Sequence, residues 1–174
     1  MENIILIGFM GAGKTEVGRL LAEKLKMTYV DTDEIIEKEQ GRSINDIFAK
    51  DGEEKFRDME SAVLSSLAKM KDHVISTGGG MVLRPANVKK LKELGPLVLL
   101  WADPEVVYNR VKDTGARPLL NVKDPKNRIK EILDFRAPIY RNVADLEVDT
   151  SALSPEEACN RIIAFVNVSG KKEK

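Results

Sequence analysis

Short apolar runs alternate along the chain with longer segments in which apolar residues recur every three or four positions. The runs have the length of buried strands, and the longer spacing is typical of amphipathic helices. We expect strands at residues 3–7, 28–30, 73–76, 96–101 and 144–148. We expect helices near residues 14–25, 43–50, 54–70, 86–94, 104–112, 126–140 and 155–166. The alternation predicts βαβ units around a parallel sheet with helices on both faces, which is a three-layer α/β domain.

Several expected helices begin at capping residues. Ser43, Asp103, Asp124 and Ser154 each stand before a helical pattern, and proline follows the last three. A side-chain oxygen at this position can bind free backbone N–H groups, and proline is tolerated in the first turn. Residues 112–125, which include DTGARPLLNVKDP, show no steady period. Because loops of this length in compact domains are often functional, we expect a mobile lid there.

Composition and charge narrow the class of protein. The 174 residues suit one domain, and the balance of 28 Lys+Arg with 28 Asp+Glu argues against nucleic-acid binding through bulk charge. A single cysteine, Cys159, excludes an internal disulfide and suits a reducing compartment. No apolar run approaches the roughly 20 residues of a membrane span, and the start shows no secretory signal. We expect a cytoplasmic, monomeric protein with no membrane partner and a frayed polar tail at residues 168–174.

The stretch GFMGAGKT joins the first expected strand to the first expected helix. Gly8, Gly13, Lys14 and Thr15 match the pattern G-x-x-x-x-G-K-[ST]. Glycines allow successive backbone N–H groups to form an anion-binding nest at a helix N-terminus. The lysine can reach the β- and γ-phosphates, and the hydroxyl can bind Mg²⁺. The sequence therefore predicts a nucleoside-triphosphate site.

Acidic residues follow the second and fourth expected strands. Asp31 and Asp33 lie where the second strand ends, at the sheet edge that faces the ligand crevice. One could lie near Mg²⁺ and the other over an acceptor hydroxyl; alternatively, Asp33 caps the helix that begins EIIEKE and Asp31 is a solvated strand end. Asp103 competes for the magnesium role, although capping before Pro104 also explains it.

A glycine triple and three arginines complete the candidate chemistry. The third strand ends in STGGG, which is either a flexible turn or bare backbone against which a small ligand lies. Arg57, Arg117 and Arg136 are either surface charges or guanidinium forks for carboxylate and phosphate. Arg136 stands just before Ala137-Pro138, and therefore at a kink or an end of a helix.

Together, GFMGAGKT, DTD, GEEKFR, STGGG, RPLL and RAPIY resemble the shikimate kinase family in order and spacing, from about residue 4 to residue 155. The resemblance implies a single P-loop kinase domain with sheet order 2-3-1-4-5, a lid at about 112–125 and a substrate-binding helical segment at about 33–61. It also implies Mg²⁺-dependent transfer of the ATP γ-phosphate to the 3-hydroxyl of shikimate, on the route to chorismate and the aromatic amino acids.

The resemblance assigns roles to individual positions. Asp33 carries over as the candidate base, with Lys14 and Arg117 acting on the transferring phosphate. The nucleotide set is Gly11, Ala12, Gly13, Lys14, Thr15, Glu16, Arg110, Arg117 and Pro155. The shikimate set is Asp33, Arg57, Gly78, Gly79, Gly80 and Arg136, and the metal set is Thr15 with Asp31 through water. Glu16 departs from the small hydroxyl residue that is frequent in the family.

Three other functions remain open at this stage. A kinase of another small hydroxyl compound, such as gluconate, would use the same scaffold. A GTPase-type switch would need N-K-x-D after an apolar strand, whereas this chain has Asn121-Val122-Lys123-Asp124 inside the expected lid. A regulatory protein could bind ATP without turnover. The apolar residues Phe48, Phe56, Met59 and Leu119 either wall the pocket or belong to the core.

Overall fold

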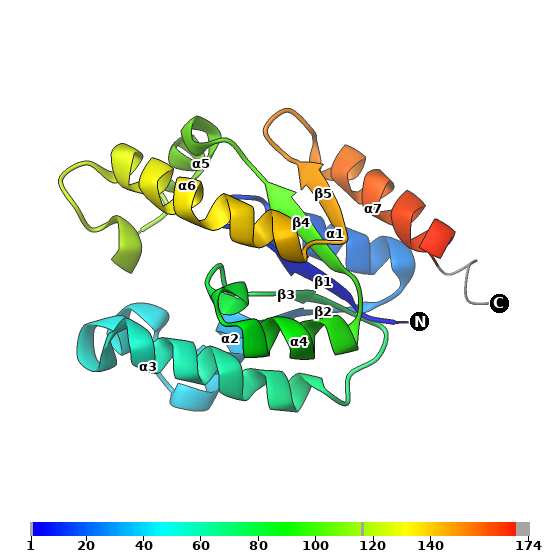
Figure 1. The fold of residues 1–174 in the computed structure, drawn as a ribbon, viewed down its shortest axis with the longest axis horizontal. Coiled ribbons are helices and arrows are strands. Elements are labelled where there is room, and N and C mark those ends of the chain that lie inside the picture. Colours follow the sequence, from blue (N-terminus) through cyan, green and yellow to red (C-terminus); the bar gives the residue numbers. More distant parts are fainter. Residues whose placement is uncertain (1, 116, 170–174) are drawn as a thin grey trace.

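A computed structural model describes residues 2–115 and 117–169 and shows a five-stranded parallel sheet in the order β2-β3-β1-β4-β5. The strands are β1 (Ile4–Ile7), β2 (Thr28–Asp31), β3 (His73–Ser76), β4 (Leu97–Trp101) and β5 (Leu146–Asp149). The expected order is confirmed, with β5 starting two residues later than the sequence predicts. β1 lies in the centre, and its carboxyl end feeds the glycine-rich loop (Figure 1).

Helices cover both faces of this sheet (Figure 1). They are α1 (Lys14–Leu25), α2 (Thr32–Gln40), α3 (Ile44–Leu67), α4 (Pro85–Leu94), α5 (Pro104–Val111), α6 (Pro125–Val143) and α7 (Pro155–Ser169), with short 3₁₀ turns η1 (Met81–Leu83) and η2 (Pro118–Leu120). Strand residues alternate between two cores: Leu6 packs with α1 and α7, and Ile5 packs with α3, α4 and α6. The period of two along each buried strand therefore produces the three layers.

The capping residues hold as predicted at three helices. Ser43 accepts from the N–H of Asp46, Asp124 accepts from that of Asn127, and Ser154 accepts from that of Glu157. Asp103 occupies the capping position of α5, but its carboxylate makes no capping bond with any residue that the structure describes.

Three expectations about local structure need correction, and one is confirmed. The helix α2 enters the expectations only through the capping alternative for Asp33, and it is capped by Asp31 rather than Asp33. The break expected between residues 43–50 and 54–70 is confirmed within α3, which is interrupted at Gly52, with φ 81° and ψ 170°. Because α6 continues through Pro138 to Val143, Arg136 does not stand at a helix end. Residues 168 and 169 end α7 rather than beginning a tail, and residues 170–174 lie outside the described residues.

Candidate active site

One cleft of about 800 Å³ opens at the carboxyl ends of β1, β2 and β3. Its volume is within the usual range for small-molecule sites. All of the residues assigned to the site from sequence line it except Ala12 and Pro155. Ala12 is buried in the glycine-rich loop, and Pro155 is the first residue of α7. We call this space the site cleft.

The glycine-rich loop has the backbone of an anion-binding nest. Gly11 and Gly13 have φ values of 73° and 91°, in the left-handed region that favours glycine. The ammonium of Lys14 donates to the carbonyl oxygens of Gly8 at 2.8 Å and Phe9 at 2.9 Å. Burial lowers the pKa of Lys14 to about 8, even though Asp33 and Asp31 act in the opposite direction. The lysine is thus held over the loop, where phosphate oxygens would replace its carbonyl partners.

The two aspartates at the end of β2 have different environments. Asp31 accepts from the backbone N–H of Asp33 at 2.9 Å and from the hydroxyl of Tyr29 at 3.1 Å. Asp33 turns into the site cleft, and its Oδ1 is buried without a partner in the part of the chain that the structure describes. Burial, with the charges of Asp31 and Glu60, raises the pKa of Asp33 to about 7 against the attraction of Lys14. A carboxylate whose pKa lies near neutral pH is suited to accept a proton during catalysis.

Arg57 and Glu60 form a buried ion pair on the inner face of α3. Nη1 of Arg57 donates to Oε2 of Glu60 at 2.8 Å, and Nη2 donates to Oε1 of Glu53 at 2.6 Å. Glu60 is fully buried, its Oε1 has no partner among the described residues, and burial raises its pKa despite Arg57. Glu60 is not among the site residues predicted from the sequence, although its spacing of three from Arg57 places both on one helix face.

The glycine triple lies between these acids and the arginines. A Cβ on Gly78 would lie 2.7 Å from Oδ1 of Asp33, and one on Gly80 would overlap the guanidinium of Arg57. None of the three has a positive φ, so close approach rather than backbone strain disfavours a side chain at Gly78 and Gly80, whereas a Cβ on Gly79 would make ordinary contacts. The backbone of this turn is therefore bordered by Asp33, Glu60 and Arg57 and carries no side chain of its own.

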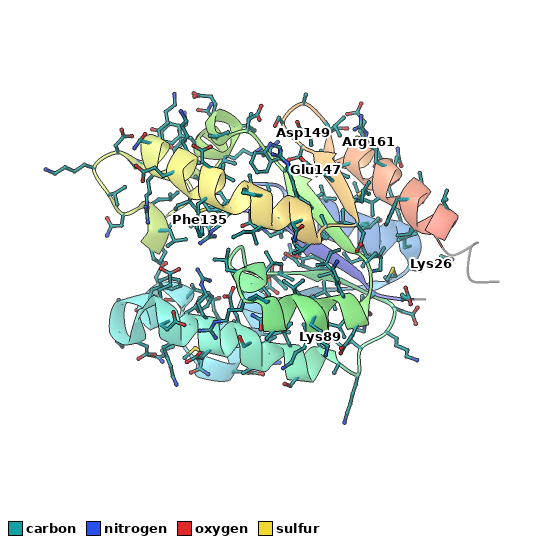
Figure 2. The ribbon with its side chains drawn as sticks, in the orientation of Figure 1. Lys26, Lys89, Phe135, Glu147, Asp149 and Arg161 are labelled. Carbon is teal, nitrogen blue, oxygen red and sulfur yellow. The ribbon has the colours of Figure 1, made fainter. Side chains whose placement is uncertain are left out.

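Arg136 and Tyr140 approach this turn from α6. Nη1 of Arg136 donates to the carbonyl oxygen of Gly79 at 3.3 Å, and the hydroxyl of Tyr140 donates to the same oxygen at 2.5 Å. Arg136 is only 5% exposed, whereas the apolar neighbour Phe135, labelled in Figure 2, is 67% exposed. This reverses the usual preference, in which arginine is exposed and phenylalanine is buried. Tyr140 was not predicted, although it stands one helical turn after Arg136.

Arg110 and Arg117 complete the cationic side of the cleft. Arg110 donates to the carbonyl oxygen of Gly11 at 3.0 Å and to that of Thr150 at 2.7 Å, which ties α5 to the glycine-rich loop and to the residue after β5. Arg117 is exposed, lines the cleft and precedes η2 in the expected lid. Its neighbour Ala116 lies outside the described residues.

The apolar candidates are divided between the lining of the site cleft and the hydrophobic core. Phe48, Phe56 and Leu119 line the site cleft, and the rings of Phe48 and Phe56 pack with centroids 4.9 Å apart. Phe56 also belongs to the core, and Met59 packs against that core. Asp103 does not line the cleft.

The residues present fit a phosphate-bound Mg²⁺ ion. Thr15, which carries a hydroxyl and directly follows the nest, and Asp31, which carries a carboxylate at the end of β2, both line the cleft. Among the described residues, no three His, Cys, Asp or Glu side chains gather as a metal site. A Mg²⁺ ion in nucleotide enzymes needs only one or two protein oxygens, because phosphates and waters supply the others.

Comparison with known proteins gives a consistent result. A family model described as shikimate kinase matches residues 10–167. The chain is 50% identical over 163 residues to a protein named shikimate kinase from Thermodesulfovibrio yellowstonii, with 94% of each chain covered. It is 45% identical to one from Caldanaerobacter subterraneus subsp. tengcongensis, covering 98% of this chain and all of the relative.

Solved structures agree with this assignment. Shikimate kinase from Acinetobacter baumannii, determined in complex with shikimate, superposes with a TM-score of 0.92 at 37% identity and covers 97% of this chain and 94% of the other. The enzyme from Aquifex aeolicus gives 0.83 at 38% identity, with 97% and 98% covered. On the strength of a family match over nearly its whole length, this chain belongs to the shikimate kinase family.

Proposed function

We propose that the protein transfers the γ-phosphate of ATP to the 3-hydroxyl of shikimate, giving shikimate 3-phosphate and ADP on the route to chorismate and aromatic amino acids. The observation that carries this proposal is the convergence of two cation sets on one cleft. Lys14 lies over a phosphate nest, while Arg57 and Arg136 flank bare glycine backbone beside Asp33. One set suits the phosphates of a donor, and the other suits the carboxylate of a small acid.

In the proposed mechanism, positioning supplies most of the rate. The arginines at 57 and 136 grip the shikimate carboxylate, which turns the 3-hydroxyl toward Asp33. The hydroxyl oxygen attacks the γ-phosphorus, its proton passes to the Asp33 carboxylate, and the bond to the ADP oxygen breaks. Lys14 and Arg117 neutralise charge on the transferring group.

The proposed Mg²⁺ site uses Thr15 directly and Asp31 through water. When bound, the ion would shield the phosphate oxygens and so favour attack by a hydroxyl. The side chain of Asp31 is already fixed by the Asp33 N–H and the Tyr29 hydroxyl, which orients its remaining lone pairs. The nucleotide set of Gly11–Glu16, Arg110 and Pro155 remains part of this proposal, with Ala12 contributing backbone only.

We further propose that residues 112–125 act as the lid of a single domain. The segment carries Arg117 and joins α5 to α6, so its closure would bring a cation over the phosphates and exclude water as a competing acceptor. The buried free thiol of Cys159 suits a reducing compartment, and we propose a cytoplasmic monomer that binds no nucleic acid. None of the helices in the described ranges could span a bilayer.

A coupled ADP-release assay tests the function directly. The protein is supplied with ATP and Mg²⁺ and, in turn, with shikimate, quinate, gluconate or no acceptor. We expect turnover that depends on shikimate, with GTP as a much weaker donor than ATP. Turnover with gluconate but not shikimate would assign a different acceptor, and ADP release independent of any acceptor would refute an acceptor kinase.

A further inference from the structure

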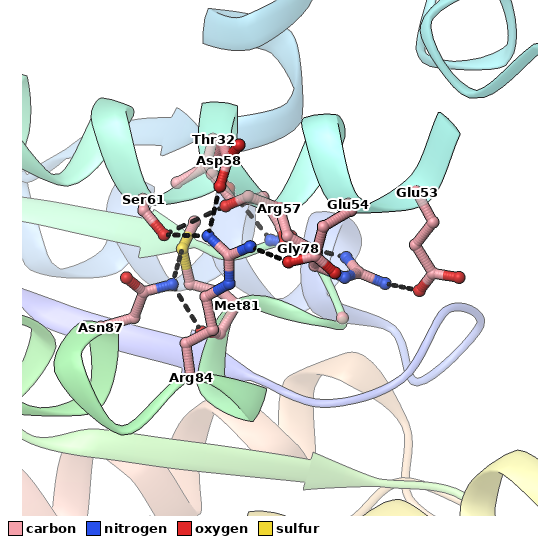
Figure 3. Close-up of polar contacts among 12 residues, drawn as sticks. Thr32, Glu53, Glu54, Arg57, Asp58, Ser61, Gly78, Met81, Arg84 and Asn87 are labelled. Carbon is pink, nitrogen blue, oxygen red and sulfur yellow. Dashed lines mark hydrogen bonds and ion pairs between the residues drawn. The ribbon is translucent and has the colours of Figure 1, made fainter. Parts of the chain in front are cut away.

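Arg84 connects the glycine turn to the helix that carries Arg57. It directly follows η1, and its side chain reaches across to α3 (Figure 3). Nη1 donates to Oδ1 of Asp58 at 2.8 Å and to Oγ of Ser61 at 3.2 Å, and Nη2 pairs with Glu54. The Ser61 hydroxyl donates in turn to the carbonyl oxygen of Arg57 at 3.0 Å. One guanidinium therefore holds two turns of α3 and reaches the Arg57 backbone through a single hydroxyl.

The three groups that Arg84 holds form one stripe of α3. Glu54, Asp58 and Ser61 are spaced by four and three residues, which places them on the same helix face. Arg57 and Glu60 lie on the adjacent face, which points into the site cleft. At 3.6 residues per turn, both faces belong to the same two turns of helix, so anything that shifts one shifts the other.

The link between Arg84 and the glycine turn is short and hydrogen-bonded. Only η1 separates Arg84 from Gly80, and the N–H of Leu83 donates to the Gly80 carbonyl oxygen at 3.0 Å. The side-chain amide of Asn87 donates to the carbonyl oxygen of Met81 at 3.0 Å, which fixes the first residue of η1. A change in the position of Arg84 would therefore also move Gly80.

The contact between Gly80 and Arg57 tolerates little movement. The guanidinium of Arg57 lies against the Gly80 backbone so closely that even a Cβ would overlap it. A shift of α3 relative to the turn by about the size of a methyl group would change which N–H groups of Arg57 face the cleft. Arg57 already bonds Glu53 and Glu60, so the donors that remain for a ligand are few and their direction matters.

We propose that Arg84 is a positioning residue for acceptor binding: it holds α3 in register with the glycine turn, so that Arg57 presents its free N–H groups to a carboxylate. This inference rests on the proposed function, because the acceptor it concerns is shikimate. An isolated exposed ion pair contributes little to stability. A planar fork that holds three groups at once fixes geometry in a way that a point charge does not.

The test compares Arg84→Gln with the unmodified protein in steady-state kinetics. We expect the KM for shikimate to rise about three- to tenfold, with kcat and the KM for ATP unchanged within twofold. Arg84→Lys should fall between the two proteins, because an ammonium keeps the charge but cannot hold all three groups. Raising the salt concentration from 0.05 to 0.5 M should shrink the difference between the two proteins, since the contacts are charged and the Arg84 side chain is 30% exposed.

The matched control is Arg141→Gln, which removes another exposed guanidinium that bridges two elements. Arg141 donates to Glu147 on β5 at 3.1 Å, away from α3 (Figure 2 labels Glu147). This control should leave the KM for shikimate unchanged. A lowered melting temperature with an unchanged KM in Arg84→Gln would overturn the positioning role and leave the proposed function standing. Failure of the unmodified protein to phosphorylate shikimate would overturn both.

Discussion

The raised pKa of Asp33 makes a prediction about stability that can be tested without substrate. Burial, aided by the charges of Asp31 and Glu60, holds this pKa at about 7. An aspartate in an unfolded chain ionises near 4. Between these values the folded protein keeps a proton that the unfolded chain has released, so ionisation opposes folding and stability falls as the pH rises. Asp33→Asn removes this dependence because the amide does not ionise.

The size of the effect follows from the two pKa values. Where only the folded state holds the proton, each pH unit lowers the free energy of unfolding by about 1.4 kcal/mol. Between pH 5 and pH 7 the loss is about 2 kcal/mol, since half of the folded molecules have released the proton at pH 7. We therefore expect Asp33→Asn to gain about 2 kcal/mol relative to the unmodified protein across this interval. Because the charge of Glu60 raises the pKa of Asp33, part of this gain comes from removing the repulsion between the two carboxylates.

Urea unfolding at pH 5, 6 and 7 measures this difference. Trp101 is the only tryptophan in the sequence and provides the fluorescence signal. Equal m-values in the two proteins would show that the substitution leaves the surface exposed on unfolding unchanged, so that the unfolding free energies can be compared. The control is Asp134→Asn, an exposed aspartate on α6, which should give a difference that does not change with pH. A constant difference between Asp33→Asn and the unmodified protein from pH 5 to 7 would refute the argument.

Three further predictions concern the cations and the glycine turn. Arg117→Ala should lower kcat by ~10³-fold or more in steady-state assays, with a much smaller change in the KM for shikimate. An unchanged kcat would show that Arg117 takes no part in phosphate transfer. Arg136→Lys should raise the Kd for shikimate about tenfold by calorimetry, because a point charge cannot replace a bidentate fork, and equal affinity would reject the carboxylate role. Gly80→Ala should raise the KM for shikimate about tenfold by displacing the Arg57 guanidinium, and it should also lower the melting temperature, because that guanidinium is buried and paired with Glu53 and Glu60; an unchanged KM would mean that the position of Arg57 does not matter for acceptor binding.

The parts of the fold that sequence predicts well are those with strong local signals. The expected helix at 14–25 coincides with α1, because the glycine-rich loop and the apolar periodicity agree on where it begins. The break between the two expected helices at 43–50 and 54–70 is the non-helical Gly52 within α3. Short elements are harder: α2 has nine residues, only two of them buried, so its periodicity is weak.

Proline at 138 shows where local rules mislead. A proline inside a helix removes one hydrogen bond and costs roughly 3 kcal/mol, which is why the sequence predicts a kink or an end of a helix near Arg136. In the structure, Leu133 and Tyr140 are buried on either side of it, and burying such residues contributes roughly 1.5–3 kcal/mol each. Tertiary packing therefore outweighs the local preference, and α6 carries Arg136 into the site as part of a continuous helix.

The residues that sequence reasoning missed are those whose role depends on what lies across the cleft. The carboxylate at position 60 and the phenol at position 140 are ordinary polar residues at helical spacing from Arg57 and Arg136. Their signal exists only once the arginines are known to point inward, because the residues one turn away then share that face. A rule that examines i+3 and i+4 neighbours of each assigned site residue would have found both.

Two buried carboxylate oxygens affect how the site would bind an acceptor. Oδ1 of Asp33 and Oε1 of Glu60 are buried without partners among the described residues, and a Cβ on Gly78 would overlap both. Two such acceptors destabilise a fold, because each loses its hydration and the charge of Glu60 raises the pKa of Asp33. A polyhydroxylated acceptor brings O–H donors to the same place, so binding would relieve a penalty already present in the free protein. Relief of this penalty would therefore add to the affinity for a polyhydroxylated acceptor.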